Sequence, residues 1–227
     1  MRFIFIILFI PFVSFAQTAE MNIRTVEISP FINLKVYSGI QIELISSDSD
    51  SLVIKTETPE EVVSVLKGST LKLRLGLEYL LQKTKTEIEI YHSQPIDLID
   101  LSQGSQLKSK GTIEQTSLSL ILQEGSKAEV NLKLEKLSAK VQSGSKLFPT
   151  GFAKNILISS TSGATCEADQ LLSEQADVKA SLGSVVYVNA SQLVDAKASV
   201  NATVRVHGSP AKLVTKESVG GKVIVME

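Results

Sequence analysis

The chain has 227 residues, with 23 basic and 24 acidic side chains and a formal net charge of −1. This length suffices for one domain, or for one domain with a capping region. No basic patch is concentrated anywhere in the sequence, which argues against nucleic acid as a partner.

The first sixteen residues have the features of a secretory signal peptide. Arg2 is a short positive region, an apolar segment follows from 3 to 13, and Ser14-Phe15-Ala16 is a small-x-small cleavage site. The apolar segment is too short for a membrane span of about 20 residues, and no later run reaches that length. We therefore expect residues 1–16 to be removed and the remaining chain to be exported.

Residues 17–95 predict short strands and one helix. Alternating apolar residues indicate the strands, and turns rich in Ser, Gly, Asp and Pro separate them. Thr58 can cap a helix, Pro59 suits its first position, Glu61 completes a capping box, and Gly68 would end it. We expect this region to be continuous with the rest of the fold and its helix to pack over the open end of the rod or beside it.

A repeat organises residues 96–227. A glycine, replaced once by asparagine, returns at steps of 18 to 21 residues and is followed by a small residue. Such spacing is typical of a solenoid, whose units cannot bury their apolar faces alone. The predicted corners are Gly104, Gly125, Gly144, Gly163, Gly183, Asn201 and Gly220.

The residues around these corners predict strands. Apolar side chains recur three positions before and after most corners, with an alternation of two that indicates a strand with one buried face. We therefore predict an all-β parallel β-helix, in which Gly or Asn supplies a left-handed corner and the serines after it form a hydroxyl ladder. The column after the corner is Leu107, Ala128, Leu147, Cys166, Val186, Val204 and Val223.

Two residues in these columns lead to further expectations. Cys166 is the only cysteine, so it cannot form an internal disulfide, and its column predicts a buried apolar residue and not a reactive thiol. An exported chain with a lone buried cysteine favours a bacterial envelope over a eukaryotic secretory pathway. Glu217 occupies an apolar column in the last coil, where we expect the register to shift and the rod to end.

Several motifs occur in a characteristic order: Phe-x-x-Leu-x-Val-x-x-Gly-Ile at 31–40, Gly-x-x-Leu-x-Leu at 68–73, Pro-Ile at 95–96 and Ile-x-Leu-Ser-x-Gly-Ser at 99–105. This order, followed by Ser-Gly-Ser coils, resembles the putative autotransporter adhesin head family, or GIN domains, of exported Bacteroidota proteins. The resemblance covers nearly the whole mature chain. The segment 206–210 resembles the family's aromatic-x-Gly-x-Pro closing motif with Val206 in place of the aromatic residue, and Gln41 stands where an Asn would lie.

The resemblance implies a single-stranded right-handed β-helix at the surface or in the periplasm of a Gram-negative bacterium. It supplies no catalytic residues. Asp50-Ser51-Leu52 also resembles the short acceptor motif for protein O-glycosylation in that phylum.

Because parallel β-helices often act on polysaccharides, we also consider a polysaccharide-active enzyme, which would need clustered carboxylates. Asp177 and Asp195 share a column on neighbouring coils, roughly 5 Å apart. Lys179 and Lys197 follow two residues later on the same face, which favours a charged surface ladder over a catalytic pair.

The best candidates for an exposed apolar contact are Phe148 and Phe152, which flank an apparent corner insertion at 149–151. The two histidines, His92 and His207, have no ligands at metal-binding spacing, and we expect neither a metal nor a cofactor. The sequence therefore favours an exported non-catalytic β-solenoid that binds a glycan or protein surface through ladders of Ser, Thr and Lys. The alternatives are a polysaccharide-active enzyme and a structural envelope component that forms a homo-oligomer.

Overall fold

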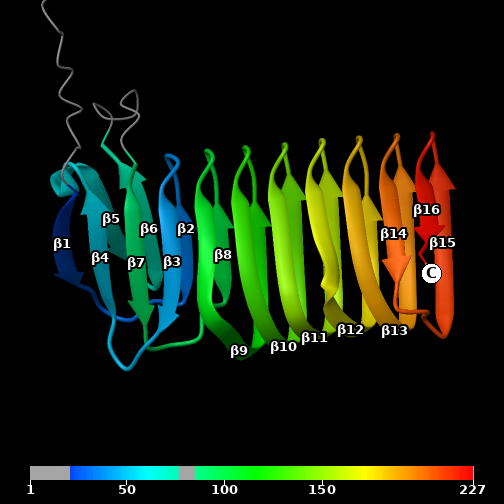
Figure 1. Ribbon diagram of the computed structural model, residues 1–227, viewed down its shortest axis with the longest axis horizontal. Coiled ribbons are helices and arrows are strands. Elements are labelled where there is room, and N and C mark those ends of the chain that lie inside the picture. Colours follow the sequence, from blue (N-terminus) through cyan, green and yellow to red (C-terminus); the bar gives the residue numbers. More distant parts are fainter. Residues whose placement is uncertain (1–20, 77–84, 227) are drawn as a thin grey trace, which may run out of the picture.

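The computed structural model describes residues 21–76 and 85–226, and it shows a parallel β-solenoid shaped as a straight rod (Figure 1). The predicted signal peptide lies outside the described residues. No helix in the described ranges is long and apolar enough to cross a membrane.

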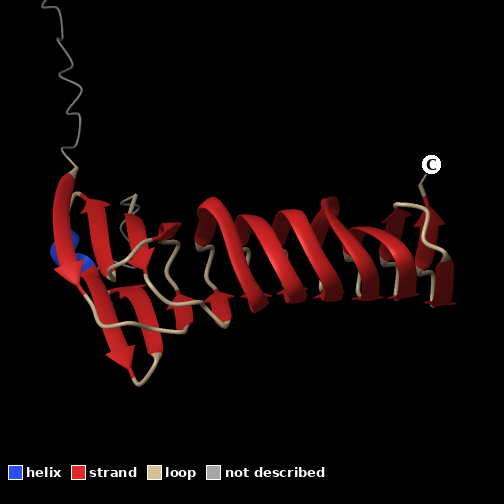
Figure 2. Cartoon of the chain, turned by 90° about the horizontal axis from the view of Figure 1, so that it is seen from below, coloured by secondary structure: helices blue, strands red, loops and turns tan. Residues whose placement is uncertain are grey.

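Two facing sheets run along the rod, and the long strands bend from one sheet into the other (Figure 2). The front sheet has the order β1 (Asn22–Glu27), β4 (Ser51–Thr56), β7 (Glu87–His92), β3 (Gln41–Ser46), the first halves of β9 (Gln106–Leu122), β10 (Lys127–Gln142), β11 (Lys146–Thr161), β12 (Thr165–Ala180) and β13 (Val185–Ser199), then β14 (Thr203–His207) and β16 (Lys222–Val225). The back sheet has the order β5 (Val62–Lys67), β6 (Thr70–Leu75), β2 (Asn33–Val36), β8 (Leu98–Leu101), the second halves of β9 to β13, and β15 (Lys212–Ser218).

Two-residue turns with positive φ at both positions connect the back sheet to the front sheet. Such turns lie at all seven predicted corners, for instance at Gln103 and Gly104, with φ of 56° and 74°, and at Val200 and Asn201, with φ of 48° and 57°. This geometry is that of a type I′ turn, which Gly and Asn adopt most readily. An eighth turn of the same kind, at Ser38 and Gly39, joins β2 to β3.

The coil formed by β2 and β3 is inserted between coils that follow it in the sequence. Strand β2 pairs with β6 and β8 in the back sheet, and β3 pairs with β7 and β9 in the front sheet. All of these pairings are parallel, whereas β4 pairs antiparallel with both β1 and β7 at the N-terminal end. The rod therefore changes from an antiparallel sandwich edge to a regular solenoid within one continuous core.

Inward-pointing columns form that core, as the alternation predicts. In the column after the corner, the residues from Leu107 to Val204 are at most 1% exposed. Cys166 is fully buried, and burial raises the pKa of its thiol to about 12, which favours the unreactive protonated form. The serines that follow the corners are also fully buried, so their hydroxyl ladder belongs to the core and not to a contact face. They are Ser105, Ser126, Ser145 and Ser184.

The predicted helix from Thr58 to Gly68 is wrong beyond its first turn. A 3-10 turn, η1, covers only Pro59–Glu61, and Thr58 makes no side-chain capping bond. The next residues form β5, which pairs antiparallel with β6. β-Branched Val62, Val63 and Val65 favour a strand, and this pairing satisfies their backbone groups along one edge.

The predicted corner insertion at 149–151 is also wrong. Strand β11 continues through this segment and keeps its register with β10, with Val130 opposite Pro149 and Leu132 opposite Gly151. The irregularity lies instead on the other side, where the pairing with β12 shifts between Leu147 and Gly151. Proline has no N–H to donate, so a break in one of the two ladders at Pro149 is expected.

The rod ends after β15 and β16, but without the predicted shift of register. Thr215 lies opposite Ala196 and Glu217 opposite Ala198. Every residue of β15 is exposed, because no further coil covers it within the described residues. Glu217 is accommodated because it is exposed, and its Oε1 accepts a hydrogen bond from the Val223 N–H at 2.6 Å.

Candidate binding surface on the front sheet

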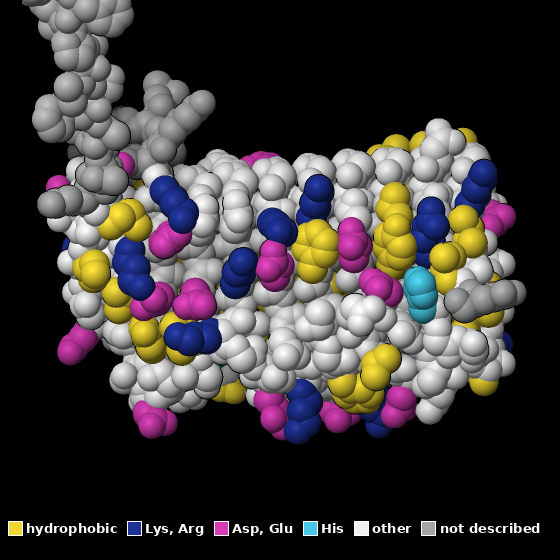
Figure 3. Space-filling model, in the orientation of Figure 1, with side chains coloured by type: hydrophobic (Ala, Val, Ile, Leu, Met, Phe, Trp, Pro, Cys, Tyr) yellow, Lys and Arg dark blue, Asp and Glu magenta, His cyan; other side chains and the backbone are white. Residues whose placement is uncertain are grey.

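The front row is the line of outward side chains four positions after each corner. Alternation fixes its direction, because the residue before each member points into the core. Pairings place Lys108 beside Glu129, Glu129 beside Phe148, and Tyr187 between Glu167 and Arg205. The row consists of Lys108, Glu129, Phe148, Glu167, Tyr187, Arg205 and Ile224. Figure 3 shows this face, where apolar side chains alternate with acidic and basic ones across the middle of the rod.

Two aromatic rings lie in the front row, two coils apart. At the usual strand spacing Phe148 and Tyr187 are separated by roughly 10 Å. The Lys127 Nζ lies 5.2 Å from the centre of the Phe148 ring, and the Arg205 Cζ lies 5.5 Å from that of Tyr187. The His207 ring stacks on the Tyr187 ring with 6.3 Å between centres and 27° between planes. The row thus offers two half-buried aromatic surfaces, each with a cation beside it.

A hollow of about 400 Å³ lies beside Phe148. It arises because β9 has extra residues opposite β10: Glu129 pairs with Lys108, but Asn131 pairs with Thr112. Such a bulge bends the strand and changes the direction of its side chains. Ser109 lies in this bulge, and its Oγ accepts a hydrogen bond from the Asn131 N–H at 2.9 Å. The hollow and the Phe148 ring together form one continuous part of the front sheet.

Glu129 neutralises part of the positive charge of the lysines in this region. It pairs with Lys127 at 2.6 Å and with Lys108 at 3.6 Å. The hydrogen bond from Lys127 is the main cause that lowers the pKa of the Glu129 carboxyl below its usual 4.5, and the Lys108 charge adds to it.

Glu129→Gln is expected to reduce the acid sensitivity of the fold. A lowered pKa means that Glu129 stabilises the folded state above pH 4.5, and that this contribution is lost as the pH falls through the folded-state value. Because the pair is exposed, the effect should be small, about 0.2–1 kcal/mol. Urea unfolding of both proteins at pH 7 and pH 3 measures it. An equal loss of stability on acidification in both would contradict this role.

Asp177 and Asp195 lie on the back sheet, far from the front row. They are register partners, as are Lys179 and Lys197, so the structure brings together the four charges that the columns predict. The Lys197 Nζ contacts the Asp195 Oδ2 at 3.0 Å, and this hydrogen bond raises the pKa of Lys197. A carboxylate paired in this way fits a surface charge ladder.

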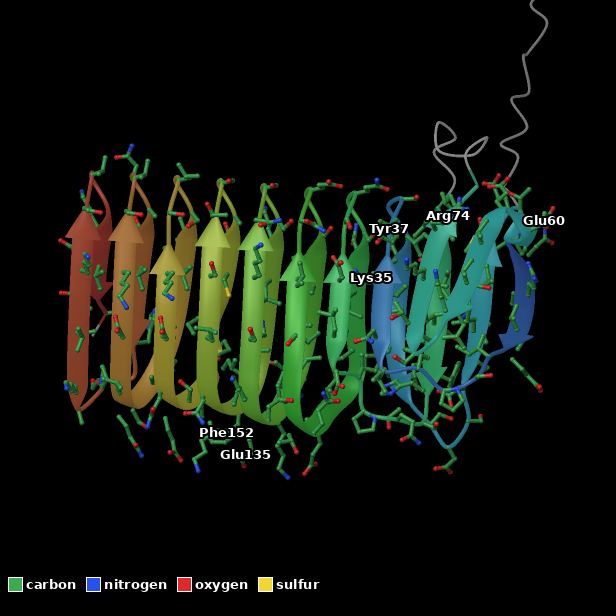
Figure 4. The ribbon with its side chains drawn as sticks, turned by 180° about the vertical axis from the view of Figure 1, so that it is seen from behind. Lys35, Tyr37, Glu60, Arg74, Glu135 and Phe152 are labelled. Atoms are coloured by element: carbon green, nitrogen blue, oxygen red, sulfur yellow. The ribbon has the colours of Figure 1, made fainter. Side chains whose placement is uncertain are left out.

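Phe152 does not share a surface with Phe148. It lies where β11 bends between the sheets, and Figure 4 shows it at the lower edge with Glu135. There it is 39% exposed beside Leu172, which is 57% exposed, and the two residues are register partners. The aromatic pair predicted from the sequence is therefore divided between two surfaces.

Sequence reasoning missed a cavity at the N-terminal part of the front sheet that is lined by both acidic and basic side chains. It has a volume of about 390 Å³, and register places Glu43 beside Glu89 in its lining. The hydrogen bond from Lys55 lowers the pKa of the Glu89 carboxyl. A general acid needs the opposite shift, so Glu89 is held as the ionised partner of Lys55.

Tyr187 and Arg205 were also missed, although the repeat contained the signal. Counted from their own corners, Phe148, Tyr187 and Arg205 all occupy the fourth position. The sequence prediction of buried residues concerned only the third position after each corner. The adjacent column is the outward row, and its aromatic members mark the candidate surface.

Comparisons with known proteins agree with this architecture. A family model described as "Putative auto-transporter adhesin, head GIN domain" matches residues 30–210. A search of curated proteins finds no match. A putative adhesin from Bacteroides fragilis superposes with a TM-score of 0.82 at 16% identity, and the alignment covers 92% of this chain and 98% of that one.

Two further solved structures, both from Parabacteroides distasonis, share the fold with the same coverage of 92% and 98%. One is a putative adhesin with a TM-score of 0.72 and 16% identity. The other is a putative lipid binding protein with a TM-score of 0.66 and 13% identity. At these identities the likeness concerns the fold alone.

Proposed function

Because the chain belongs to the family of putative auto-transporter adhesin head GIN domains, we propose that it is an exported, non-catalytic module that binds a glycan through its front sheet. The family and the adhesins of Bacteroidales that share its fold support a surface-binding role. The predicted signal peptide supports export to the periplasm or cell surface.

One observation carries the glycan proposal: the front row presents Phe148 and Tyr187 in line, roughly 10 Å apart, with the charged residues Glu129, Glu167 and Arg205 next to them. Aromatic rings provide rigid apolar contact for the faces of sugar rings, while neighbouring polar groups bind hydroxyls. Regular spacing along a rod lets several weak contacts act on one chain and raises the effective affinity. The mechanism is therefore multivalent contact along the rod.

A glycan-array screen of residues 17–227, followed by assay of reducing-end release from every hit, tests this proposal. We expect binding without turnover. Turnover of a bound glycan would favour the polysaccharide-active alternative and direct attention to the cavity at Glu43 and Glu89 and to Asp177 and Asp195. Absence of binding to any glycan would contradict the proposal and favour a protein partner.

The third alternative, a self-associating envelope component, would use an exposed end of the rod. At the C-terminal end the inward-facing Leu213 and Val225 are 36% and 55% exposed. Edge strands with apolar side chains pair readily with other chains, and inward-pointing charged residues prevent this. Glu217 occupies such an inward position and accepts a hydrogen bond from β16, so we propose that it keeps this end from associating.

Glu217→Val is expected to make the chain associate. The change extends the apolar column of Ala198 to the end of the rod and frees the Val223 N–H for another strand. Sedimentation velocity over a hundredfold concentration range should show a rising mean mass for this variant and a constant one for the unmodified chain. Lys216→Gln, an outward change on the same strand, is the matched control. Constant mass in all three proteins would contradict the proposed role of Glu217.

A further inference from the structure

Arg205 is a front-row cation that has no acidic partner among the described residues. Two other cations of the front sheet, Lys108 and Lys127, are both paired with Glu129. Arg205 instead lies against the Tyr187 ring, and its Nε is buried without a hydrogen-bond partner in the described ranges. A guanidinium has five donors in a planar fork, and no hydrogen bond of the terminal N–H groups of Arg205 is found in the described ranges, so these groups have capacity for an acceptor from outside the chain.

The surroundings of Arg205 favour an anion. Its register partners are Tyr187 on one side and Ile224 on the other. Along its own strand, the outward residues are Thr203 and His207, and Lys222 is the register partner of Thr203. None of these groups is acidic. A carboxylate placed here would therefore meet a cation without displacing an existing ion pair.

The opposite side of Tyr187 has the opposite charge. Glu167 is its register partner on the preceding coil, and no ion pair of Glu167 is found in the described part of the chain. Because Tyr187 separates the two charges, Glu167 and Arg205 lie two coils apart, roughly 10 Å. A sugar ring on the Tyr187 ring would thus have a guanidinium at one edge and a carboxylate at the other.

We infer that Tyr187 and Arg205 select glycans that carry carboxylated sugars. This inference rests on the proposed function and specifies the ligand class of the same surface. The Tyr187 ring packs against the apolar face of the sugar, Arg205 donates hydrogen bonds to its carboxylate, and Glu167 accepts a hydrogen bond from a hydroxyl. The charges at the two edges also fix the direction in which the glycan lies along the rod.

Paired probes test this inference: oligogalacturonides with free carboxylates, and the same oligomers as methyl esters. We expect residues 17–227 to bind the free acid at least about tenfold more tightly, because a hydrogen bond to a charged carboxylate is stronger than one to a neutral ester. Arg205→Gln should abolish this preference, because it weakens binding of the free acid more than binding of the ester. Arg205→Lys should retain part of it, because lysine keeps the charge but loses the planar fork.

Lys179→Gln, on the back sheet, is the matched control for removing one positive charge, and it should keep the full preference. Equal binding of acid and ester by the unmodified chain would overturn the inference while leaving the proposed glycan-binding function intact. A preference that persists in Arg205→Gln would also overturn it. Absence of binding to both probes and to every other glycan would contradict the proposed function itself.

Discussion

Gly151→Ala is expected to lower the free energy of unfolding by roughly 2–5 kcal/mol, because two costs combine at this position. The φ of Gly151 is +97°, a conformation that strains any residue with a Cβ. An added Cβ would lie 2.3 Å from the Leu132 backbone oxygen and 2.7 Å from the Asn131 Oδ1. Leu132 belongs to the adjacent coil, so relief of the clash requires two paired strands to separate. The midpoint of urea unfolding, followed by circular dichroism, measures the effect.

Gly125→Ala is the matched control. Gly125 has a φ of +74° at a corner, but its added Cβ would meet nothing within 4 Å. Only the conformational cost remains, about 1–2 kcal/mol. Equal losses in the two variants would mean that the contact between β10 and β11 at Gly151 is looser than described.

Ile158→Ala is expected to cost about 2–5 kcal/mol, because it opens a cavity in the middle of the core. Ile158 is fully buried, and its register partners, Ala139 and Val178, point into the same core. These neighbours belong to rigid ladders on both sides, so the cavity cannot collapse easily.

Leu157→Ala provides the comparison, since Leu157 is the preceding residue of the same strand but is 38% exposed on the back sheet. We expect its loss to stay within about 0.5 kcal/mol. A larger loss for Leu157 than for Ile158 in thermal or urea unfolding would place the strand in the opposite register, because a slip of one residue exchanges the two faces.

The repetitive part of the fold could be predicted because each coil repeats the same pattern of a corner and alternating buried residues. Gly104 and its equivalents mark turns that need positive φ, and columns such as Leu147–Cys166–Val186 record which side of each strand is buried. The pattern of a single coil is a weak signal, but its repetition at a regular period identifies a β-solenoid. The family resemblance, confirmed by the match over residues 30–210, rested on the order of the motifs between 31 and 105 and on the Ser-Gly-Ser coils that follow them.

The first coil could not be placed from the sequence, because long-range pairing decides its position. No sequence pattern in residues 33–46 indicates that β2 and β3 lie between strands from later in the chain. The prediction of a helix after Thr58 was wrong for a related reason. Its capping residues favour a helix locally, but the free edge of β6 offers a complete ladder of hydrogen bonds to a strand rich in valine.

The candidate surface was predicted only in part. Phe148 was identified as exposed, but its pairing with Phe152 assumed a corner that the continuous register of β10 and β11 rules out. Asp177 and Asp195 were placed beside each other, because the column spacing contains that information. The alignment of Phe148, Tyr187 and Arg205 depends on the relation between neighbouring coils. It was predictable in principle, because all three residues occupy the same outward position after a corner.

Equilibrium binding of the strongest glycan hit to two double variants tests the central claim most directly. Phe148→Ala/Tyr187→Ala removes both rings of the front row, whereas Leu157→Ala/Lys179→Ala alters the back sheet to a similar extent. We expect the front variant to lose at least about tenfold in affinity and the back variant to bind like the unmodified chain. Unchanged binding by the front variant, together with loss in the back variant, would contradict the front sheet as the binding surface.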